Sequence, residues 1–161
     1  MIRMVLAAAA LFLPVEGTQE QAPEVEIANP EASPFNPKAD ANAEVDAALT
    51  RAKAGNHMTL IVMGANWCHD SRALAGWLSQ PHFAAMIASR YELIYVDVGY
   101  KDRNTDIARR FGLKSIKGTP TVLIVGTNGK LLNKKDAPTW RNASSRSGDD
   151  VYKTLAEFTP A

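Results

Sequence analysis

The chain has 161 residues, a length that corresponds to one domain with room for a short extension. Apolar residues make up 46% and charged residues 22%, ordinary fractions for a globular protein, which excludes a wholly disordered or collagen-like chain. The net charge of +1 provides no global field that would favour nucleic acid or an anionic membrane as partner. The single cysteine, Cys68, can neither form an internal disulfide nor complete a four-cysteine zinc site.

The N-terminus has the pattern of a secretory signal peptide. Arg3 precedes ten apolar residues, Met4 to Leu13, which would span about 15 Å as a helix, half of a ~30 Å hydrocarbon core. Such a run is typical of a signal peptide and too short for a membrane span. We therefore expect a signal at residues 1–17 and a secreted or periplasmic protein with no stable membrane insertion after cleavage. The alternative is a buried N-terminal helix or strand.

Residues 18–40 are predicted to form a mobile linker. They contain four prolines, several glutamates and few large apolar side chains. Repeated prolines interrupt helices and lack the amide hydrogens that a sheet needs. The folded domain is therefore expected at residues 41–161.

From about residue 40 the hydrophobic pattern predicts alternating helices and strands. In chain order we expect a helix around residues 45–55, a strand at 59–63, a helix at about 69–79, a short helix around 83–87, a strand at 93–96, a helix at about 107–111 and a strand at 121–125. The three apolar runs are typical of strands covered on both faces.

The pair Asn128-Gly129 favours a tight hairpin turn, so we expect an antiparallel edge strand beginning at Leu131 and Leu132. Residues 133–148 are predicted to be a polar loop with a solvated basic surface, in which Trp140 is either a contact site or folded back on the domain. A last amphipathic helix carries Val151, Leu155 and Phe158. Together these elements predict an α/β fold, a three-layer sandwich with a mixed sheet.

Cys68 follows a predicted strand and begins a predicted helix. Unpaired amide hydrogens and the helix dipole favour an anion there, so this position predicts a nucleophilic thiolate. His69 would add positive charge when protonated and Asp70 would oppose it, while the hydroxyl of Ser71, one turn on, is within reach of the sulfur. The alternative is a structural thiol, because free cysteines are among the most buried residues.

The segment Trp67-Cys68-His69-Asp70-Ser71, with Gly118-Thr119-Pro120-Thr121 before a later strand, resembles the thioredoxin superfamily. The segments 64–68, 80–83 and 95–98 are most similar to the C-terminal domain of periplasmic thiol-disulfide interchange proteins. The resemblance covers about residues 40–160. It implies a thioredoxin-like sandwich in which the motif faces a loop with a cis-proline.

The resemblance also implies roles for individual residues. Cys68 takes the place of the nucleophile, Trp67 that of the flanking aromatic residue and Pro120 that of the cis-proline. Thr119 takes the place of the residue whose backbone binds a peptide. The implied partners are a cysteine-containing client protein or peptide and an external thiol reductant.

Two positions depart from the family pattern. Ser71 replaces the second cysteine, and a hydroxyl cannot resolve a mixed disulfide, so an external thiol must do so. An engineered serine that traps mixed disulfides would give the same motif. Val62 occupies a strand position where many thioredoxins carry a buried acid.

Two functions remain open at this level. One is monothiol exchange through Cys68, which includes reduction, isomerisation or client capture. The other is a non-catalytic module that binds a peptide or protein in the same groove. The scattered residues His57, His82 and Asp97 give no metal-binding spacing, so we expect no metal and no cofactor.

Overall fold

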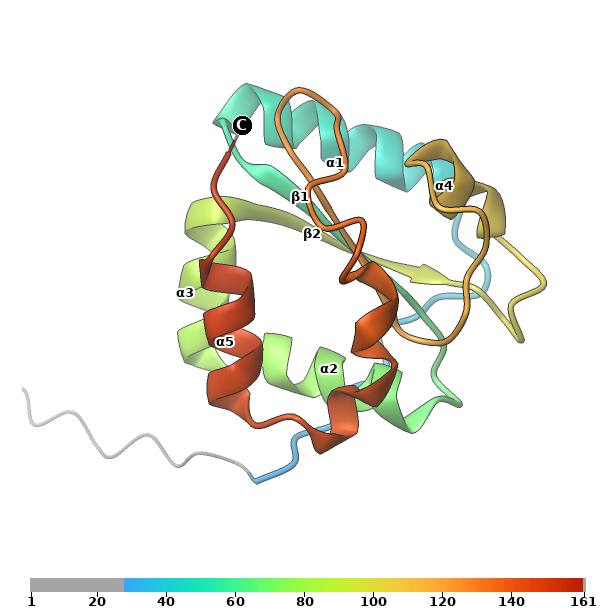
Figure 1. The fold of residues 1–161 in the computed structure, drawn as a ribbon, viewed down its shortest axis with the longest axis vertical. Helices are drawn as coiled ribbons and strands as arrows, with labels where there is room; N and C mark the ends of the chain where they lie inside the picture. The colour runs from blue at the N-terminus through green and yellow to red at the C-terminus, as the bar shows by residue number, and fades with distance from the viewer. Residues whose placement is uncertain (1–27, 161) are drawn as a thin grey trace, which may run out of the picture.

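The computed structural model describes residues 28–160 and has three layers (Figure 1). The middle layer is a sheet of three strands in the order β2-β1-β3, namely β1 (Met58–Gly64), β2 (Tyr91–Asp97) and β3 (Thr121–Val125). β1 pairs in parallel with β2 and antiparallel with β3, so that Val62 lies between Tyr95 and Val122. The predicted mixed sheet is confirmed.

Helices cover both faces of the sheet (Figure 1). One face carries two of them, α1 (Ala41–Gly55) and α4 (Thr105–Arg110). The opposite face carries three, α2 (His69–Leu78), α3 (Pro81–Arg90) and α5 (Gly148–Ala156). This arrangement is the predicted sandwich.

Side chains of β1 alternate between the two cores. Leu60 and Val62 belong to the core beneath α2, α3 and α5, whereas Ile61 and Met63 belong to the core beneath α1 and α4. Because both faces are covered, the strand reads as a continuous apolar run rather than an alternating one. Its last residue, Gly64, leads directly to the loop before Cys68.

The free edge of β3 differs from the prediction. After the turn, the pairing continues through an antiparallel bridge between Val125 and Leu131 and a hydrogen bond from Leu132 N to Ile124 O at 2.8 Å. The side chain of Asn133 occupies the next positions: its Oδ1 accepts from Ile124 N, and its Nδ2 donates to Val122 O, both at 2.9 Å. The predicted antiparallel pairing is therefore present at Leu131 and Leu132 but extends no further as a strand, because one buried amide side chain satisfies the next backbone groups of β3 instead.

The predicted loop at 133–148 contains a 3-10 helix, η1 (Ala137–Ser145). This helix is kinked at Asn142, whose φ of −120° and ψ of 28° are not helical, and Ala137, Trp140 and Ala143 are buried in it. Trp140 is 1% exposed and folds back on the domain, with the Arg146 guanidinium carbon 4.6 Å from its ring centroid. The following helix, α5, ends at Ala156, before Phe158.

Part of the predicted linker packs against the domain. Phe35 is 1% exposed and belongs to the core that also contains Trp77. Pro30 is buried, and its backbone passes so close to Gly76 on α2 that a Cβ there would collide with it. The expectation of a mobile segment is therefore wrong from Pro30 onward. The predicted signal peptide and residues 18–27 lie outside the described residues.

Candidate functional site

Cys68 is the N-cap of α2 and lies beside the segment that precedes β3. Its thiol donates a hydrogen bond to the carbonyl oxygen of Thr119, with 3.3 Å between Sγ and O. The Thr119–Pro120 peptide bond is cis. Cys68 and Thr119 are each 8% exposed, so both residues are largely buried. Residues 51 positions apart in sequence therefore form one site.

The helix N-terminus does not hold the sulfur directly. Cys68 makes no capping hydrogen bond through its side chain to the amides of the first turn of α2. Its backbone carbonyl instead accepts from Arg72 N at 3.0 Å. The predicted placement at the start of the helix is correct, whereas the hydrogen-bond partner of the thiol is the Thr119 carbonyl.

Ser71 lies behind the cysteine rather than against its sulfur. It is fully buried, and its Oγ accepts a hydrogen bond from Ala65 N at 3.4 Å. Among the described residues no hydrogen bond joins Ser71 to Sγ of Cys68. A Cβ on Gly64 would lie 2.6 Å from this Oγ and 2.7 Å from the Phe35 ring. Ser71 therefore holds the loop before Cys68 in a crowded space that only glycine at position 64 permits.

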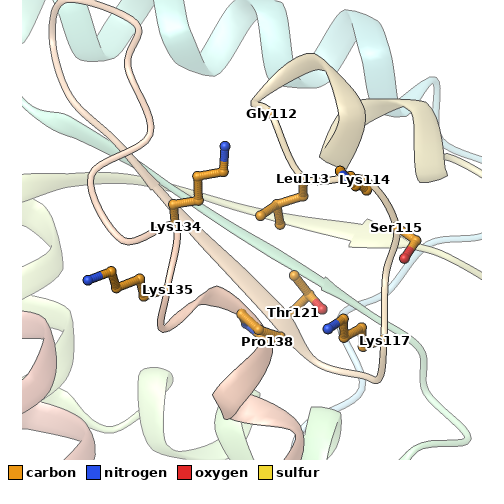
Figure 2. Close-up of a pocket in the computed structure, with 9 residues that line it drawn as sticks. All are labelled: Gly112, Leu113, Lys114, Ser115, Lys117, Thr121, Lys134, Lys135 and Pro138. Carbon is orange, nitrogen blue, oxygen red and sulfur yellow. The ribbon is translucent and has the colours of Figure 1, made fainter.

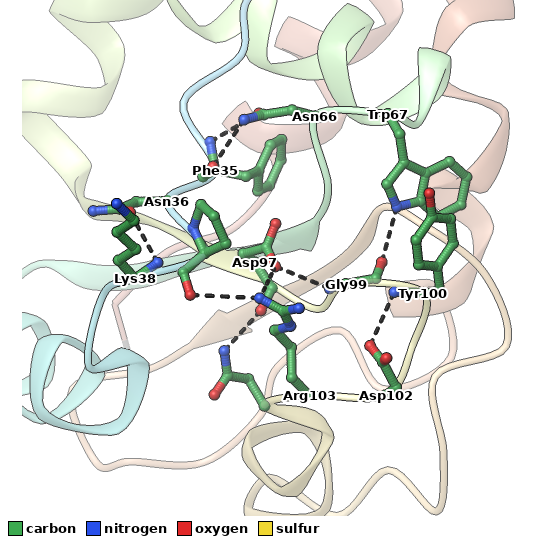
Figure 3. A network of polar contacts seen from close by, with 12 residues as sticks. Phe35, Asn36, Lys38, Asn66, Trp67, Asp97, Gly99, Tyr100, Asp102 and Arg103 are labelled. Carbon is green, nitrogen blue, oxygen red and sulfur yellow. Dashed lines mark hydrogen bonds and ion pairs between the residues drawn. The ribbon is translucent and has the colours of Figure 1, made fainter.

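Trp67, the residue before Cys68, presents an exposed aromatic surface, and Figure 3 shows its ring beside that of Tyr100. Its indole Nε1 donates to Gly99 O at 3.0 Å, and its ring stacks on Tyr100 with 5.1 Å between centroids and 15° between planes. Trp67 is 49% exposed and Tyr100 is 74% exposed, and they are the exposed large hydrophobic residues of the described chain. The pair forms a flat apolar platform.

The loop that carries Tyr100 is held by its own polar contacts (Figure 3). The carboxylate of Asp97 accepts from Gly99 N at 3.0 Å and lies 3.7 Å from Arg103. Asp102 accepts from Tyr100 N at 3.0 Å. Gly99 has a φ of +55° and lies against the Asp102 carboxylate, so a side chain there would be both strained and obstructed. The loop therefore fixes Tyr100 in place before any partner binds.

The two charged residues after Cys68 point to different partners. His69 Nε2 lies 3.0 Å from Glu31 Oε1, and the other oxygen of Glu31 binds Arg72 Nε at 3.0 Å. Asp70 Oδ1 accepts from the backbone N of Ser144 at 2.9 Å and from its hydroxyl at 2.7 Å. Asp70 thus ties α2 to η1, and within residues 28–160 no hydrogen bond or ion pair joins His69 or Asp70 to the sulfur.

Sequence reasoning missed the clasp between Phe35 and Asn66 (Figure 3). Phe35 N donates to Asn66 Oδ1 at 3.0 Å, and Asn66 Nδ2 donates to Phe35 O at 2.8 Å. This exchange fastens the segment before α1 to the loop before Cys68. A single aromatic residue among prolines was the available signal, because Phe35 is the one large apolar side chain between residues 28 and 40.

Burial changes the acidity of two tyrosines on β2. Loss of solvation raises the pKa of Tyr95 to about 12, and its ring packs edge-on against Phe35 with 5.4 Å between centroids. Burial also raises the pKa of Tyr91, against a smaller opposing effect of Arg90, and Tyr91 donates its hydroxyl hydrogen to Leu155 O at 2.6 Å. Both phenols are therefore neutral at physiological pH.

In residues 28–160, no group of three or more His, Cys, Asp or Glu side chains is placed to hold a metal ion. None of the helices in this range is long and apolar enough to cross a membrane.

Comparison with known proteins places this site in a family. A family model described as thioredoxin-like matches residues 40–127. The chain is similar to the crystal structure of a disulphide isomerase from Xylella fastidiosa Temecula1, with 34% identity and a TM-score of 0.73 over 78% of this chain and 96% of that chain. It is also similar to a poplar thioredoxin h, with 17% identity and a TM-score of 0.48 over 73% of this chain and 88% of that chain. No curated protein matches. Because the family match spans more than half of the sequence, the chain belongs to the thioredoxin-like family.

Proposed function

We propose that the protein performs thiol-disulfide exchange on cysteine-containing clients through Cys68 alone. The observation that carries the proposal is the hydrogen bond of the Cys68 thiol to Thr119 O, beside the cis Thr119–Pro120 bond. A client strand that pairs with the backbone at Thr119 would bring its own sulfur next to Sγ. The similarity to a disulphide isomerase supports this class of reaction.

In the first step the Cys68 thiolate attacks one sulfur of a client disulfide. A bond forms between Sγ and that sulfur, the client S–S bond breaks, and the departing client thiolate takes up a proton. The protein and client are then joined by a mixed disulfide. One S–S bond forms and one breaks, so this step is an exchange without net oxidation or reduction.

Ser71 cannot complete the cycle, because an alcohol does not attack a disulfide under these conditions. Release needs a second thiol, either another cysteine of the client or an external thiol. When the client's own thiolate attacks the client sulfur of the mixed disulfide, the client leaves with a rearranged disulfide and Cys68 is regenerated. When two external thiols act in turn, the client leaves reduced and the external pair is oxidised to a disulfide.

A second candidate is a binding module that uses the same groove without turnover. The low exposure of Cys68, 8%, and the serine at position 71 in place of a second thiol favour this candidate. In that case the client would bind through its backbone and through the Trp67–Tyr100 platform. A mixed disulfide would then not form.

We also propose export of the protein, with residues 1–17 as a signal peptide, followed by a segment that fastens to the domain from Pro30 onward. N-terminal sequencing of protein from the extracytoplasmic fraction tests this proposal. A mature chain that begins near Thr18 supports it, whereas a chain that retains Met1 in the cytoplasm contradicts it.

The exchange proposal is tested with a peptide that contains a single disulfide to a chromophoric thiol. The full chain should release the chromophore and gain the mass of one peptide, and the Cys68→Ala variant should do neither. A client protein with scrambled disulfides is then incubated with the chain to distinguish turnover from capture. Recovery of native pairings with a small external thiol supports catalysis, whereas stable binding without exchange supports the module.

A further inference from the structure

A second concave site adjoins the Thr119–Pro120 segment (Figure 2). It is a cavity of about 390 Å³ lined by Gly112, Leu113, Lys114, Ser115, Lys117, Thr121, Lys134, Lys135 and Pro138. Lys117 precedes Thr119 by two positions and Thr121 follows Pro120 directly. The cavity and the candidate functional site therefore share one short stretch of chain.

The charged side chains that line this cavity are all positive. Four of the nine lysines of the chain line it, and no acidic residue does, although the whole protein has a net charge of only +1. All four lysines are exposed, and within residues 28–160 none of their ammonium groups forms an ion pair. The nearest acid in the sequence, Asp136, lies outside the lining. The cavity thus concentrates positive charge that the protein itself does not neutralise.

The lysines come from two separate segments. Lys114 and Lys117 lie on the stretch between α4 and β3, and Lys134 and Lys135 lie on the stretch before η1. Figure 2 shows the two segments on opposite sides of the cavity, with Leu113 and Pro138 between the charged groups. An occupant would therefore meet cations on both sides and apolar surface between them. A carboxylate on a short methylene stem, as in glutamate, matches that combination.

We propose that this cavity binds an acidic segment of the client polypeptide. The proposal rests on the proposed function, because it assumes a client strand that passes Thr119 on its way to Cys68. An extended strand advances about 3.3 Å per residue, so glutamates a few positions from the client cysteine would reach Lys117 and its neighbours. The cavity would then select clients by charge, while the groove beside Cys68 binds any backbone.

Nucleic acid fits the cavity less well than an acidic peptide. Proteins that bind single strands combine cations with aromatic platforms on which bases stack. The lining contains neither an aromatic residue nor an arginine. The exposed aromatic pair, Trp67 and Tyr100, belongs to other loops.

The test uses two peptides of equal length without cysteine, one with four glutamates and one with glutamines in their place. Binding to the full, isotope-labelled chain is followed by NMR. The acidic peptide should shift the amide signals of residues 112–121 and 134–138 and bind at least tenfold more tightly than the neutral one. Its affinity should fall severalfold as the salt concentration rises from about 0.05 to 0.3 M, because exposed charges are screened.

Variants that remove positive charge show where on the protein the acidic peptide binds. Lys117→Gln combined with Lys134→Gln should weaken the acidic peptide roughly three- to tenfold, as expected for two exposed ion pairs. Lys130→Gln combined with Lys153→Gln removes the same two charges from exposed positions outside the cavity, so it is the matched control and should change affinity less than twofold. Equal weakening by this control, equal binding of the two peptides, or signals that move elsewhere would overturn the proposal.

Two further outcomes distinguish acidic-peptide binding in the cavity from nucleic-acid binding there and from the proposed exchange at Cys68. An oligonucleotide of the same charge that binds more tightly than the peptide, at the same signals, would replace the client assignment with a nucleic-acid one. Because the peptides lack cysteine, their binding does not depend on exchange at Cys68. Failure of the exchange reaction with intact peptide binding would refute the proposed function alone, and the reverse result would refute the cavity's role alone.

Discussion

The thiol of Cys68 donates to the carbonyl oxygen of Thr119 across 3.3 Å, and this contact joins the start of α2 to the cis-proline segment before β3. In the proposed exchange reaction, a client strand that pairs with the backbone at Thr119 would take the place of this contact before Cys68 reacts. We therefore expect the rate of exchange to depend on how the client approaches Thr119.

The Trp67–Tyr100 platform is expected to contribute to client docking. Replacement of Tyr100 by Ala removes one ring of a stacked pair, and such pairs contribute about 0.5–1.5 kcal/mol. We expect the rate of mixed-disulfide formation to fall roughly three- to tenfold. Tyr100→Phe keeps the stacked ring and should react at the normal rate. An unchanged rate in Tyr100→Ala would show that the platform plays no part in docking.

The clasp between Asn66 and Phe35 is expected to stabilise the site. Asn66→Ala removes both side-chain hydrogen bonds and leaves two backbone groups of Phe35 without these partners. The free energy of unfolding should fall by about 1–3 kcal/mol, measured by chemical denaturation. Asn36→Ala, on an exposed neighbour whose side chain accepts from Lys38 N, is the control and should cost less than about 0.5 kcal/mol. Equal losses in the two variants would contradict a specific role for the clasp.

Alkaline pH is expected to destabilise the fold through Tyr95. The phenol ionises near pH 10 in the unfolded chain but has a pKa of about 12 in the folded protein. Between these values the unfolded state has lost a proton that the folded state keeps, so the free energy of unfolding falls as the pH rises. Full stability is retained below pH 10. Denaturation from pH 8 to 11 measures this slope.

Tyr95→Phe should flatten that alkaline slope. The variant keeps the edge-on packing against Phe35 and removes the ionisable hydroxyl. Tyr100→Phe changes an exposed ring and should keep the slope of the unmodified protein. A slope that stays the same in Tyr95→Phe would contradict the assignment to this residue. Any slope that remains would be assigned to Tyr91, whose pKa burial also raises.

A second thiol at position 71 should change the chemistry from exchange to dithiol reduction. Cys68 caps α2 and Ser71 lies in its first turn, three residues further on, so Ser71→Cys should form an internal disulfide with Cys68 on mild oxidation. Mass spectrometry would show the loss of two hydrogens and of both free thiols. Ser71→Ala, which has the same backbone position without a thiol, is the control. If Ser71→Cys keeps two free thiols, the two side chains do not meet.

The sheet and the site were predictable for different reasons. Apolar runs such as 59–63 identify strands, because a strand that is buried on both faces has apolar residues at consecutive positions. Cys68 and Thr119 were paired through a family resemblance, since no periodicity links residues so far apart. Asn133 and Phe35 escaped prediction because each acts through a hydrogen bond or a core contact with a distant segment. Tyr100 escaped because an exposed aromatic residue in a polar loop leaves no pattern.

The most direct test of the central claim is the reaction of the full chain with a peptide disulfide, followed by intact-mass analysis under non-reducing conditions. The account predicts one peptide bound per chain through Cys68, complete release on addition of an external thiol, and no adduct with Cys68→Ala. Absence of an adduct in the unmodified chain, under conditions where the peptide binds, would contradict thiol-disulfide exchange as the function of this protein.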